Sequence, residues 1–338
     1  MALGTCPPPL AGSTSLTLRP TDTHRRRSLA QNRPLRALGS QNVVPRSKET
    51  KTVTEIAGRR LTLTNLDKVL YPDAGFTKAG VVDYYARIGP VIIPHLRRRP
   101  LTMVRYPNGI AGESFFEKRC PSHAPSWVAT GTADPDLTAC LVDDLPTLVW
   151  VANLASLELH TPQATVDDAA HPTSMVFDLD PGAPAGTLDC CRVALQLREL
   201  LDRLGLVSVV KTSGSKGLHL AVPVTRATAD DTKSFARALG QLLEKQEPDR
   251  VTVNMNKAQR PGRVFVDWSQ NDRHKATVCV YSLRAQPRPI VSAPVTWDEV
   301  ADALDRNDAE SLVFRRAERI GDPFAANVGE GRELPKLA

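Results

Sequence analysis

Two aspartates at the end of an apolar segment constrain the fold of this chain more than any other feature. Asp178 and Asp180 follow the apolar run 175–177 and precede Pro181 and Gly182. Residues two apart in an extended strand point to the same face of a sheet, and a Pro-Gly pair stops a strand and turns the backbone. We therefore expect a buried strand that presents two carboxylates side by side at its end.

Paired carboxylates repel each other unless a cation lies between them, and Mg²⁺ or Mn²⁺ supplies that charge. The pattern alone is equally typical of a solvated turn after a buried strand. Two later segments favour the metal site. Residues 213–219 read Ser-Gly-Ser-Lys-Gly-Leu-His, with the donors of a phosphate-binding loop, and the apolar run 264–266 ends in Asp267. Alone, Asp267 is also typical of a turn, but the combination favours nucleotidyl transfer.

Length and composition are those of a globular protein. The 338 residues are 41% hydrophobic, enough for one large core or two smaller ones. No apolar run is long enough for a transmembrane helix. The six cysteines form no Cys-x-x-Cys pair, and Cys120 with His123 supplies only half of a zinc site. We expect a cytosolic protein with reduced thiols.

The net charge of +6 resides in the first 50 residues. That segment holds eight Lys or Arg against two acidic residues, whereas the remainder holds 35 of each sign. Residues 1–50 contain three consecutive prolines and no helical or strand period, so we expect a disordered basic tail. A nucleic-acid surface on the folded part must then be a local patch.

Three further segments follow the tail. Residues 51–172 form an N-terminal module with a helix over 77–88 that Thr77 caps. Residues 173–290 alternate strands with helices over 187–204 and 231–245 in the order β-α-β-β-α-β. That order favours an antiparallel sheet with its helices on one face, as in RRM-like folds. Residues 291–338 are expected to form a C-terminal helical segment.

Five motifs in order carry a family resemblance. They are Asn-Leu-Asp-Lys-Val-Leu-Tyr-Pro at 65–72 and the segments 177–182, 213–220, 264–271 and 281–284. Together they resemble the polymerase domain of bacterial ligase D, a branch of the archaeo-eukaryotic primase superfamily, over residues 55–290. The resemblance implies an α+β fold, with an RRM-like antiparallel-sheet catalytic module and an N-terminal α/β module. The chain has no Lys-x-Asp-Gly ligase motif and no nuclease segment, so it is either a stand-alone polymerase or one cut from a fusion.

The resemblance also assigns roles to residues. Asp178, Asp180 and Asp267 match carboxylates that hold two Mg²⁺ or Mn²⁺ ions, which activate a primer 3′-hydroxyl and stabilise the leaving pyrophosphate. The expected nucleotide-binding residues are His160, Ser213, Ser215, Lys216, His219, Arg260 and Arg284. A histidine or an arginine of this kind is also common as a structural or surface residue.

The expected DNA contacts lie in the N-terminal module. Lys68 and Lys78 match a pair that holds the 5′-phosphate of the downstream strand, and Phe115 and Phe116 match aromatics that stack on template bases. Solvated lysines and core phenylalanines are the alternatives. Val104 stands where relatives often carry a second basic residue beside Arg105, so phosphate contact there is expected to be weaker.

The function implied is template-dependent extension or gap filling at DNA breaks, with a preference for ribonucleotides, during double-strand break repair by non-homologous end joining. The expected partners are DNA with gaps or ends bearing a 5′-phosphate, NTPs or dNTPs, and candidates Ku and a separate DNA ligase. We expect no membrane association and a location in the bacterial cytoplasm, at the nucleoid.

Three alternatives stay open. A haloacid-dehalogenase-like phosphatase also begins with a strand leading to Asp-x-Asp, but it requires Thr or Val where this chain has Gly182. A non-catalytic module that binds DNA ends would use the same lysines and aromatics, although it would not need three carboxylates. Primer synthesis or gap filling in another repair pathway would use the same motifs.

Overall fold

The computed structural model describes residues 49–134, 136–313 and 322–336. Almost all of the expected basic tail, residues 1–48, therefore lies outside the described residues. Every element below belongs to one compact unit, Lys48–Ala338.

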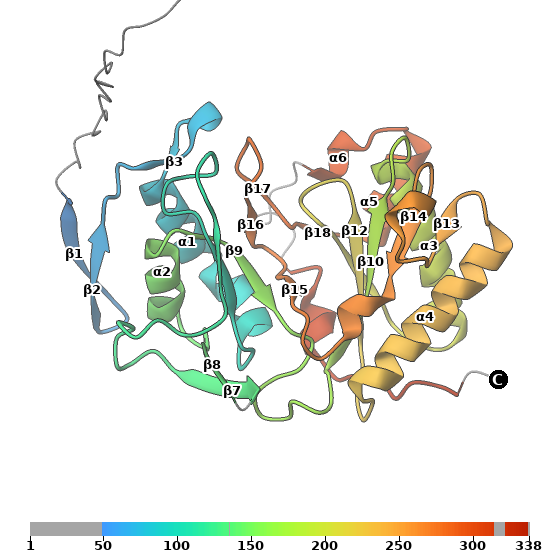
Figure 1. The fold of residues 1–338 in the computed structure, drawn as a ribbon, viewed down its shortest axis with the longest axis horizontal. Coiled ribbons are helices and arrows are strands. Elements are labelled where there is room, and N and C mark those ends of the chain that lie inside the picture. Colours follow the sequence, from blue (N-terminus) through green and yellow to red (C-terminus); the bar gives the residue numbers. More distant parts are fainter. Residues whose placement is uncertain (1–48, 135, 314–321, 337–338) are drawn as a thin grey trace, which may run out of the picture. The chain divides into compact units, whose positions relative to one another are not determined.

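The N-terminal half of this unit is built around a four-stranded sheet with the order β15-β9-β5-β6. Its strands are antiparallel: β5 (Thr102–Arg105), β6 (Phe115–Glu117), β9 (Ser156–Thr161) and β15 (Thr277–Val278). Three two-stranded pairs accompany it: β1 (Lys51–Ile56) with β2 (Arg59–Thr64), β3 (Val69–Tyr71) with β4 (Phe76–Thr77), and β7 (Thr130–Asp134) with β8 (Leu137–Cys140). The helices α1 (Lys78–Leu96) and α2 (Leu145–Asn153) pack against each other beside this sheet (Figure 1).

Helix α1 begins where the sequence predicts but continues beyond the predicted end. The Thr77 side chain accepts a hydrogen bond from the Gly80 N–H, as an N-cap does. The helix then passes Pro90 and ends at Leu96, because its last turns bury apolar side chains such as Ile92 in the core. Tertiary packing here outweighs the local cost of proline within a helix.

The C-terminal half contains a six-stranded sheet with the order β13-β14-β10-β12-β11-β18. Its strands are β10 (Ser174–Pro181), β11 (Val209–Thr212), β12 (Leu218–Pro223), β13 (Val251–Thr252), β14 (Val264–Asp267) and β18 (Pro294–Val295). All neighbours are antiparallel except β13 and β14. The helices of this half are α3 (Thr187–Arg203), α4 (Ala229–Gln246), α5 (Trp297–Asp305) and the short α6 (Glu310–Val313). The predicted α+β fold with an antiparallel catalytic sheet is confirmed.

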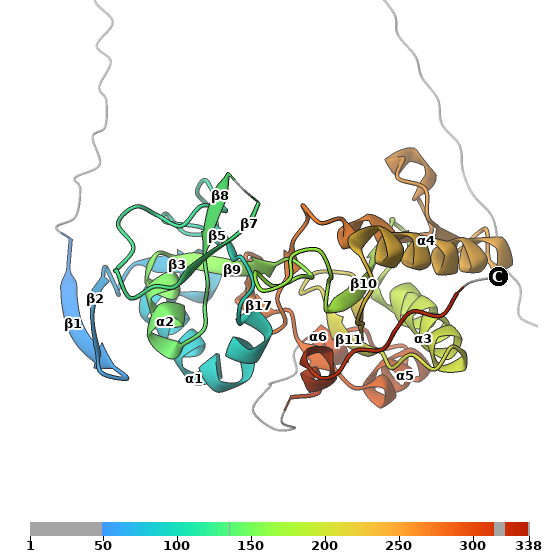
Figure 2. The same ribbon diagram turned by 90° about the horizontal axis from the view of Figure 1, so that it is seen from below.

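The two faces of β10 have different neighbours. Met175, Phe177 and Leu179 share one core with apolar residues of α3, α4 and α5, whereas Val176 belongs to the core of the N-terminal half. Figures 1 and 2 show these helices on the side of the sheet that lies away from α1 and α2. Since side chains alternate along a strand, Asp178 shares its face with Val176 and points toward the N-terminal half.

A connecting segment leads from the edge of the four-stranded sheet toward the six-stranded sheet. It includes β15, β16 (Leu283–Arg284) and β17 (Ile290–Val291), which run between β9 and β12 in Figure 1. Two tyrosines of the N-terminal half hold it, because the Tyr71 hydroxyl donates to the Arg284 carbonyl and the Tyr84 hydroxyl to the Tyr281 carbonyl. None of the helices in the described residues is long and apolar enough to cross a membrane.

The cysteines differ in part from the expectation. Cys120 and Cys140 are joined by a disulfide, so reduced thiols at these two positions were wrongly predicted. Backbone pairing brings them together, because the Cys120 N–H donates to the Thr138 carbonyl, two residues before Cys140. The two cysteines are 20 residues apart in the sequence, so no local motif indicated that they lie close together. Cys190, Cys191 and Cys279 are free thiols.

Candidate active site

Three carboxylates meet on one face of the six-stranded sheet. Asp178 of β10 lies directly opposite Asp267 of β14, and Asp180 follows two residues after Asp178. Residues opposite each other in an antiparallel pair share a face, as do residues two apart on one strand. The fold therefore brings together the three aspartates that the motifs single out, and we call them the carboxylate row.

The carboxylate row carries mutually repelling charge. Reduced hydration, followed by the charges of Asp178 and Asp267, raises the pKa of Asp180 to about 6, although its side chain reaches solvent. Burial by itself would raise the pKa of Asp178, but His219, Lys211 and Arg284 together outweigh burial and lower this pKa. A cation between the carboxylates would offset this repulsion.

The donor set fits a hard divalent cation, because Mg²⁺ and Mn²⁺ prefer carboxylate oxygens. Asp178 Oδ1 lies 3.1 Å from His219 Nε2, yet the geometry leaves this buried oxygen without a well-formed hydrogen bond. Within the described parts of the chain, no three acidic, histidine or cysteine side chains already stand in a metal-holding arrangement. Side-chain rotation would therefore have to accompany ion binding.

Asp267 is held by the turn that follows it. Its Oδ1 accepts hydrogen bonds from the backbone N–H and the hydroxyl of Ser269, and its Oδ2 accepts one from Gln270. Lys275 donates to the same Ser269 hydroxyl. These contacts fix the carboxylate at the end of β14, which is what a metal ligand requires.

Two further polar residues extend the row across the sheet. His219 of β12 lies opposite Asp178, and Lys211 of β11 lies opposite His219. Lys211 Nζ is 3.2 Å from His219 Nδ1 and donates to the Ser292 hydroxyl. The structure thus places His219 against a carboxylate, while its predicted contact with the nucleotide stays a prediction. Lys211 was not predicted from the sequence, and burial lowers its pKa to about 7.

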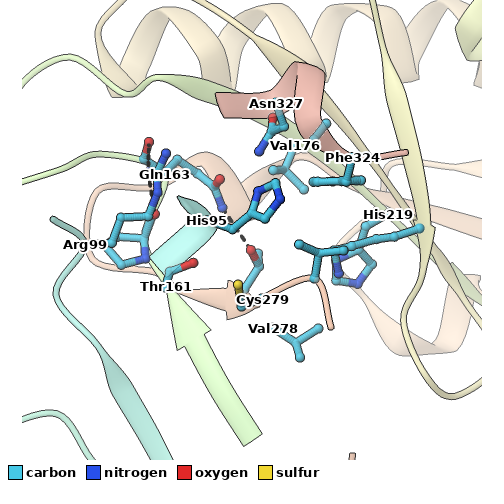
Figure 3. A pocket seen from close by; sticks show the side chains of 15 residues that line it. His95, Arg99, Thr161, Gln163, Val176, His219, Val278, Cys279, Phe324 and Asn327 are labelled. Carbon is cyan, nitrogen blue, oxygen red and sulfur yellow. Dashed lines mark hydrogen bonds between the residues drawn. The ribbon is translucent and has the colours of Figure 1, made fainter. Parts of the chain in front are cut away.

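A small cavity lies behind His219 and Lys211. Figure 3 shows its lining, which includes His219 and Cys279 as well as His95 and Arg99 of the N-terminal half. Its volume is about 40 Å³, which is room for a few water molecules but not for a nucleotide. A nucleotide could therefore approach the carboxylate row only from outside this cavity.

The predicted phosphate loop, residues 213–217, connects β11 to β12 beside the row. The buried Ser213 hydroxyl accepts hydrogen bonds from the N–H groups of Ser215 and Gly217, so it shapes the loop from inside. Gly217 is required because a Cβ there would lie 2.3 Å from the Leu179 carbonyl oxygen. Ser215 and Lys216 are exposed on the outside, where a ligand can reach them.

Arg284 packs on this loop and joins it to the N-terminal half. A Cβ at Gly214 would lie 2.4 Å from Arg284 Cγ, so the glycine makes room for the arginine. The guanidinium Nη1 is 3.4 Å from Glu158 Oε2, and the same oxygen is 2.9 Å from His160 Nε2. Two predicted nucleotide-binding residues from different strands are therefore held by one buried carboxylate.

Glu158 was missed in the sequence, although a signal was present. Glu158 and His160 are two residues apart on β9, so they share a face. Burial alone would raise the pKa of Glu158, but interactions with His160, Arg284 and the Ala285 N–H together outweigh burial and lower this pKa. Its Oε1 also accepts from the Ala285 N–H. Glu158 is a positioning residue for His160 and Arg284.

Arg260 packs on β14, on the side of the carboxylate row that lies away from His219 and Lys211. Its guanidinium stacks 3.7 Å from the centre of the Phe265 ring, and Phe265 lies opposite Asp180 in the sheet. The charge of Arg260 lowers the pKa of Asp180, against the stronger effects that raise it. A basic residue beside the row is therefore present where it was predicted.

Lys68 and Lys78 line one groove of about 600 Å³ in the N-terminal half. The Lys78 side chain is buried, and its Nζ donates to the backbone oxygen and the hydroxyl of Thr64. Burial, followed by the charge of Lys68, lowers the pKa of Lys78 to about 8. Lys68 Nζ donates to Asn108. The groove, also lined by Arg105, is called the lysine groove below.

Phe115 and Phe116 lie on the edge strand β6 and are exposed, Phe116 by 71%. Core packing is therefore excluded for both. The Phe116 ring lies 6.4 Å from the His160 ring in an edge-on arrangement. An exposed aromatic next to a predicted nucleotide-binding histidine offers a free face to an unpaired base.

The chain was compared with known proteins. Residues 77–324 match the family model described as LigD, primase-polymerase domain, a range that excludes Lys68. The chain is 44% identical over 272 residues to the multifunctional non-homologous end joining protein LigD of Mycolicibacterium smegmatis, covering 79% of this chain and 36% of that protein. It is 31% identical over 268 residues to the bifunctional non-homologous end joining protein LigD of Bacillus subtilis, covering 78% and 44%.

A solved structure agrees with these sequence matches. The polymerase domain from Mycobacterium tuberculosis ligase D, in complex with DNA, superimposes with a TM-score of 0.74 at 37% identity, covering 80% of this chain and 99% of that one. The chain spans little more than a third of the mycobacterial curated relatives it matches. The resemblance predicted from the motifs is therefore confirmed.

Proposed function

Because the chain belongs to the family of LigD primase-polymerase domains, we propose that it is a template-dependent nucleotidyltransferase that extends strands or fills gaps at DNA breaks during non-homologous end joining. The observation that carries the proposal is the carboxylate row. Asp178 and Asp267 lie opposite each other with Asp180 two residues on, and the exposed Lys216 follows on the loop beside them.

Each group has one task in this reaction. Lys216, Ser215 and Arg284 bind the triphosphate, Arg284 in the orientation that Glu158 gives it. Two divalent ions held by the carboxylate row would lower the pKa of the primer 3′-hydroxyl and stabilise charge on the departing pyrophosphate. The row orients those ions, and Ser269 holds Asp267 in place for this purpose. Mg²⁺ and Mn²⁺ both suit these oxygen donors.

The lysine groove would hold the 5′-phosphate of the downstream strand, and Phe115 and Phe116 would stack on template bases. Lys78 begins helix α1, and the helix dipole places partial positive charge at this end. A terminal phosphate carries more negative charge than an internal diester. The preferred DNA is therefore a gap or an end with a recessed 5′-phosphate.

Further details of the proposal follow from the family. Ribonucleotides are the preferred substrates, read through their 2′-hydroxyl by His160 or a serine of the phosphate loop. Ku and a separate DNA ligase are the partners, and DNA ends at the nucleoid in the bacterial cytoplasm are the place of action. Primer synthesis or gap filling in another repair pathway uses the same chemistry.

Nucleotide incorporation on a short gapped duplex tests the proposal. The full chain is assayed with Mn²⁺ or Mg²⁺, with a 5′-phosphate or a 5′-hydroxyl on the downstream strand, and with ribonucleotides or deoxyribonucleotides. We expect templated addition that is faster with ribonucleotides and with the 5′-phosphate. Tight DNA binding without any addition would instead support a non-catalytic module that binds DNA ends.

A further inference from the structure

A second pocket lies beyond the predicted nucleotide site, at the end of the four-stranded sheet. Its volume is about 390 Å³. Lys118, which follows β6, lies on one side, and the loop 272–276, which follows Asp267, lies on the other. Leu137, Pro162 and small residues of the loop 162–173 form its apolar floor. We call it the basic pocket.

The cations of the basic pocket are not neutralised by carboxylates. Lys118 and Arg273 are exposed, and within the described residues neither side chain has a carboxylate partner. Lys275 donates to the Ser269 hydroxyl. Of the acidic residues next to these cations in the sequence, Asp272 is already paired with Lys233 and Glu117 with Arg105. By contrast, many exposed basic residues elsewhere are ion-paired, as Arg98 is with Asp167.

The basic pocket is continuous with the face of the sheet that carries His160. Thr102, which lines the pocket, lies opposite His160, and the next residue, Met103, lies opposite Glu117. Lys118 therefore lies beside Thr102 on the same face. Phe116, two residues before Lys118, points to this face and its ring lies 6.4 Å from that of His160. A strand that stacks on Phe116 would reach the basic pocket with its next nucleotide.

We propose that the basic pocket binds an unpaired nucleotide of the DNA template strand, next to the base that stacks on Phe116. This inference rests on the proposed function. Lys118 and Arg273 bind the phosphodiester, because a cation without a carboxylate partner is free to replace the counterions of a phosphate. The base lies on the apolar floor formed by Leu137 and Pro162. Phosphate contacts of this kind set the position of a strand without reading its sequence.

The test uses the double variant Lys118→Ala, Arg273→Ala and two DNA duplexes. One carries a template overhang of roughly ten nucleotides, within the range of single-stranded binding sites, and the other is blunt. Both carry a 5′-phosphate. We expect affinity for the overhang duplex to fall roughly tenfold, and the slope of log K against log salt to fall by about 1.4, as for two lost single-strand phosphate contacts. Affinity for the blunt duplex stays within about twofold.

A matched control removes the same charge elsewhere. Lys245, in the last turn of α4, and Arg250, which lies just beyond the helix and pairs with Glu247, are exposed. Their double alanine variant should bind both duplexes as the wild-type protein does. An equal loss in this control, or an equal loss on the blunt duplex, would overturn the proposal. Lys275 is left intact because Ser269 links it to Asp267.

Neutral methylphosphonate linkages distinguish the template strand from the primer strand. A single such linkage near the overhang junction of the template should weaken binding by the wild-type protein but have little further effect on the variant, which is the signature of a shared contact. If instead a linkage in the primer strand weakens binding by the wild-type protein but not by the variant, the basic pocket binds the primer strand and the proposal is wrong. Because binding is measured without nucleotide addition, a failure of this proposal can be distinguished from a failure of the proposed polymerase activity.

Discussion

The carboxylate row gathers negatively charged groups, whereas the lysine groove gathers positively charged ones. In the row, the like charges of Asp178 and Asp267 help to raise the pKa of Asp180 to about 6, so the protein stores repulsion that a cation relieves. In the groove, burial and then the charge of Lys68 lower the pKa of Lys78 to about 8, so the protein holds a poorly hydrated cation that an anion would stabilise. In each region the charged form of a side chain is disfavoured in the protein alone, and a ligand of the opposite charge would stabilise it.

This contrast implies that the two regions are separable. Asp178 points from the six-stranded sheet, whereas Lys78 begins a helix that packs beside the other sheet. Changes in the carboxylate row should stop chemistry and leave DNA-end selection intact. Changes in the lysine groove should remove end selection and leave chemistry intact on an open primer-template.

The largest effect is expected for Asp178→Ala. Loss of one ligand of the metal pair should lower nucleotide incorporation at least about a thousandfold, because metal stabilisation of the transition state contributes several kcal/mol. Preference for a 5′-phosphate should persist in a binding assay. Asp202→Ala, which removes an exposed carboxylate of α3, is the control and should be as active as wild type. Wild-type-like extension by a folded Asp178→Ala protein would contradict the role of the row.

Lys216→Ala is expected to have the next largest effect. The variant lacks a charge-assisted contact, which typically contributes about 1.5–3 kcal/mol, so the nucleotide KM should rise roughly 10- to 100-fold while DNA affinity hardly changes. Lys245→Ala serves as a control because Lys245 is exposed on α4. If DNA affinity falls and the nucleotide KM does not, the phosphate loop binds DNA rather than the triphosphate.

The contrast between the regions also explains what the sequence could predict. Asp178, Asp180 and residues 213–217 lie in short motifs whose spacing fixes their geometry, so the row and loop were predictable. Glu158 and Lys211 act through partners on other strands, Arg284 and His219, and their roles appear only once the sheets are assembled. The apolar side chains that carry α1 past Pro90 are another tertiary effect.

A third prediction concerns the double variant Lys68→Ala, Lys78→Ala. Wild-type protein should bind a recessed 5′-phosphate roughly tenfold more tightly than a 5′-hydroxyl, and more so at low salt. The variant should bind both ends equally while still extending an open primer-template. Lys51→Ala, a change in an exposed residue of β1, should keep the preference. Equal affinity of the wild-type protein for the 5′-phosphate and the 5′-hydroxyl would mean that the lysine groove does not bind the terminal phosphate.

The smallest effect is a pH dependence confined to the lysine groove. Because the pKa of Lys78 is lowered to about 8, its side chain is cationic below that pH and neutral above it. The second ionisation of the terminal phosphate, near pH 6, is already complete. Preference for a 5′-phosphate should therefore shrink about threefold between about pH 7 and pH 9, as titration of one of two cations predicts.

Lys78→Arg separates this titration from other effects of pH, because a guanidinium keeps its proton over the same range. The arginine variant should retain its 5′-phosphate preference up to about pH 9, whatever its affinity at neutral pH. Folding has the opposite pH dependence. A lysine whose pKa is lower in the folded state makes unfolding costlier as pH rises between about 8 and its ordinary value of 10.5. A 5′-phosphate preference that falls with pH equally in wild type and Lys78→Arg would mean that another group titrates, and Lys78 would then be a structural residue that anchors Thr64.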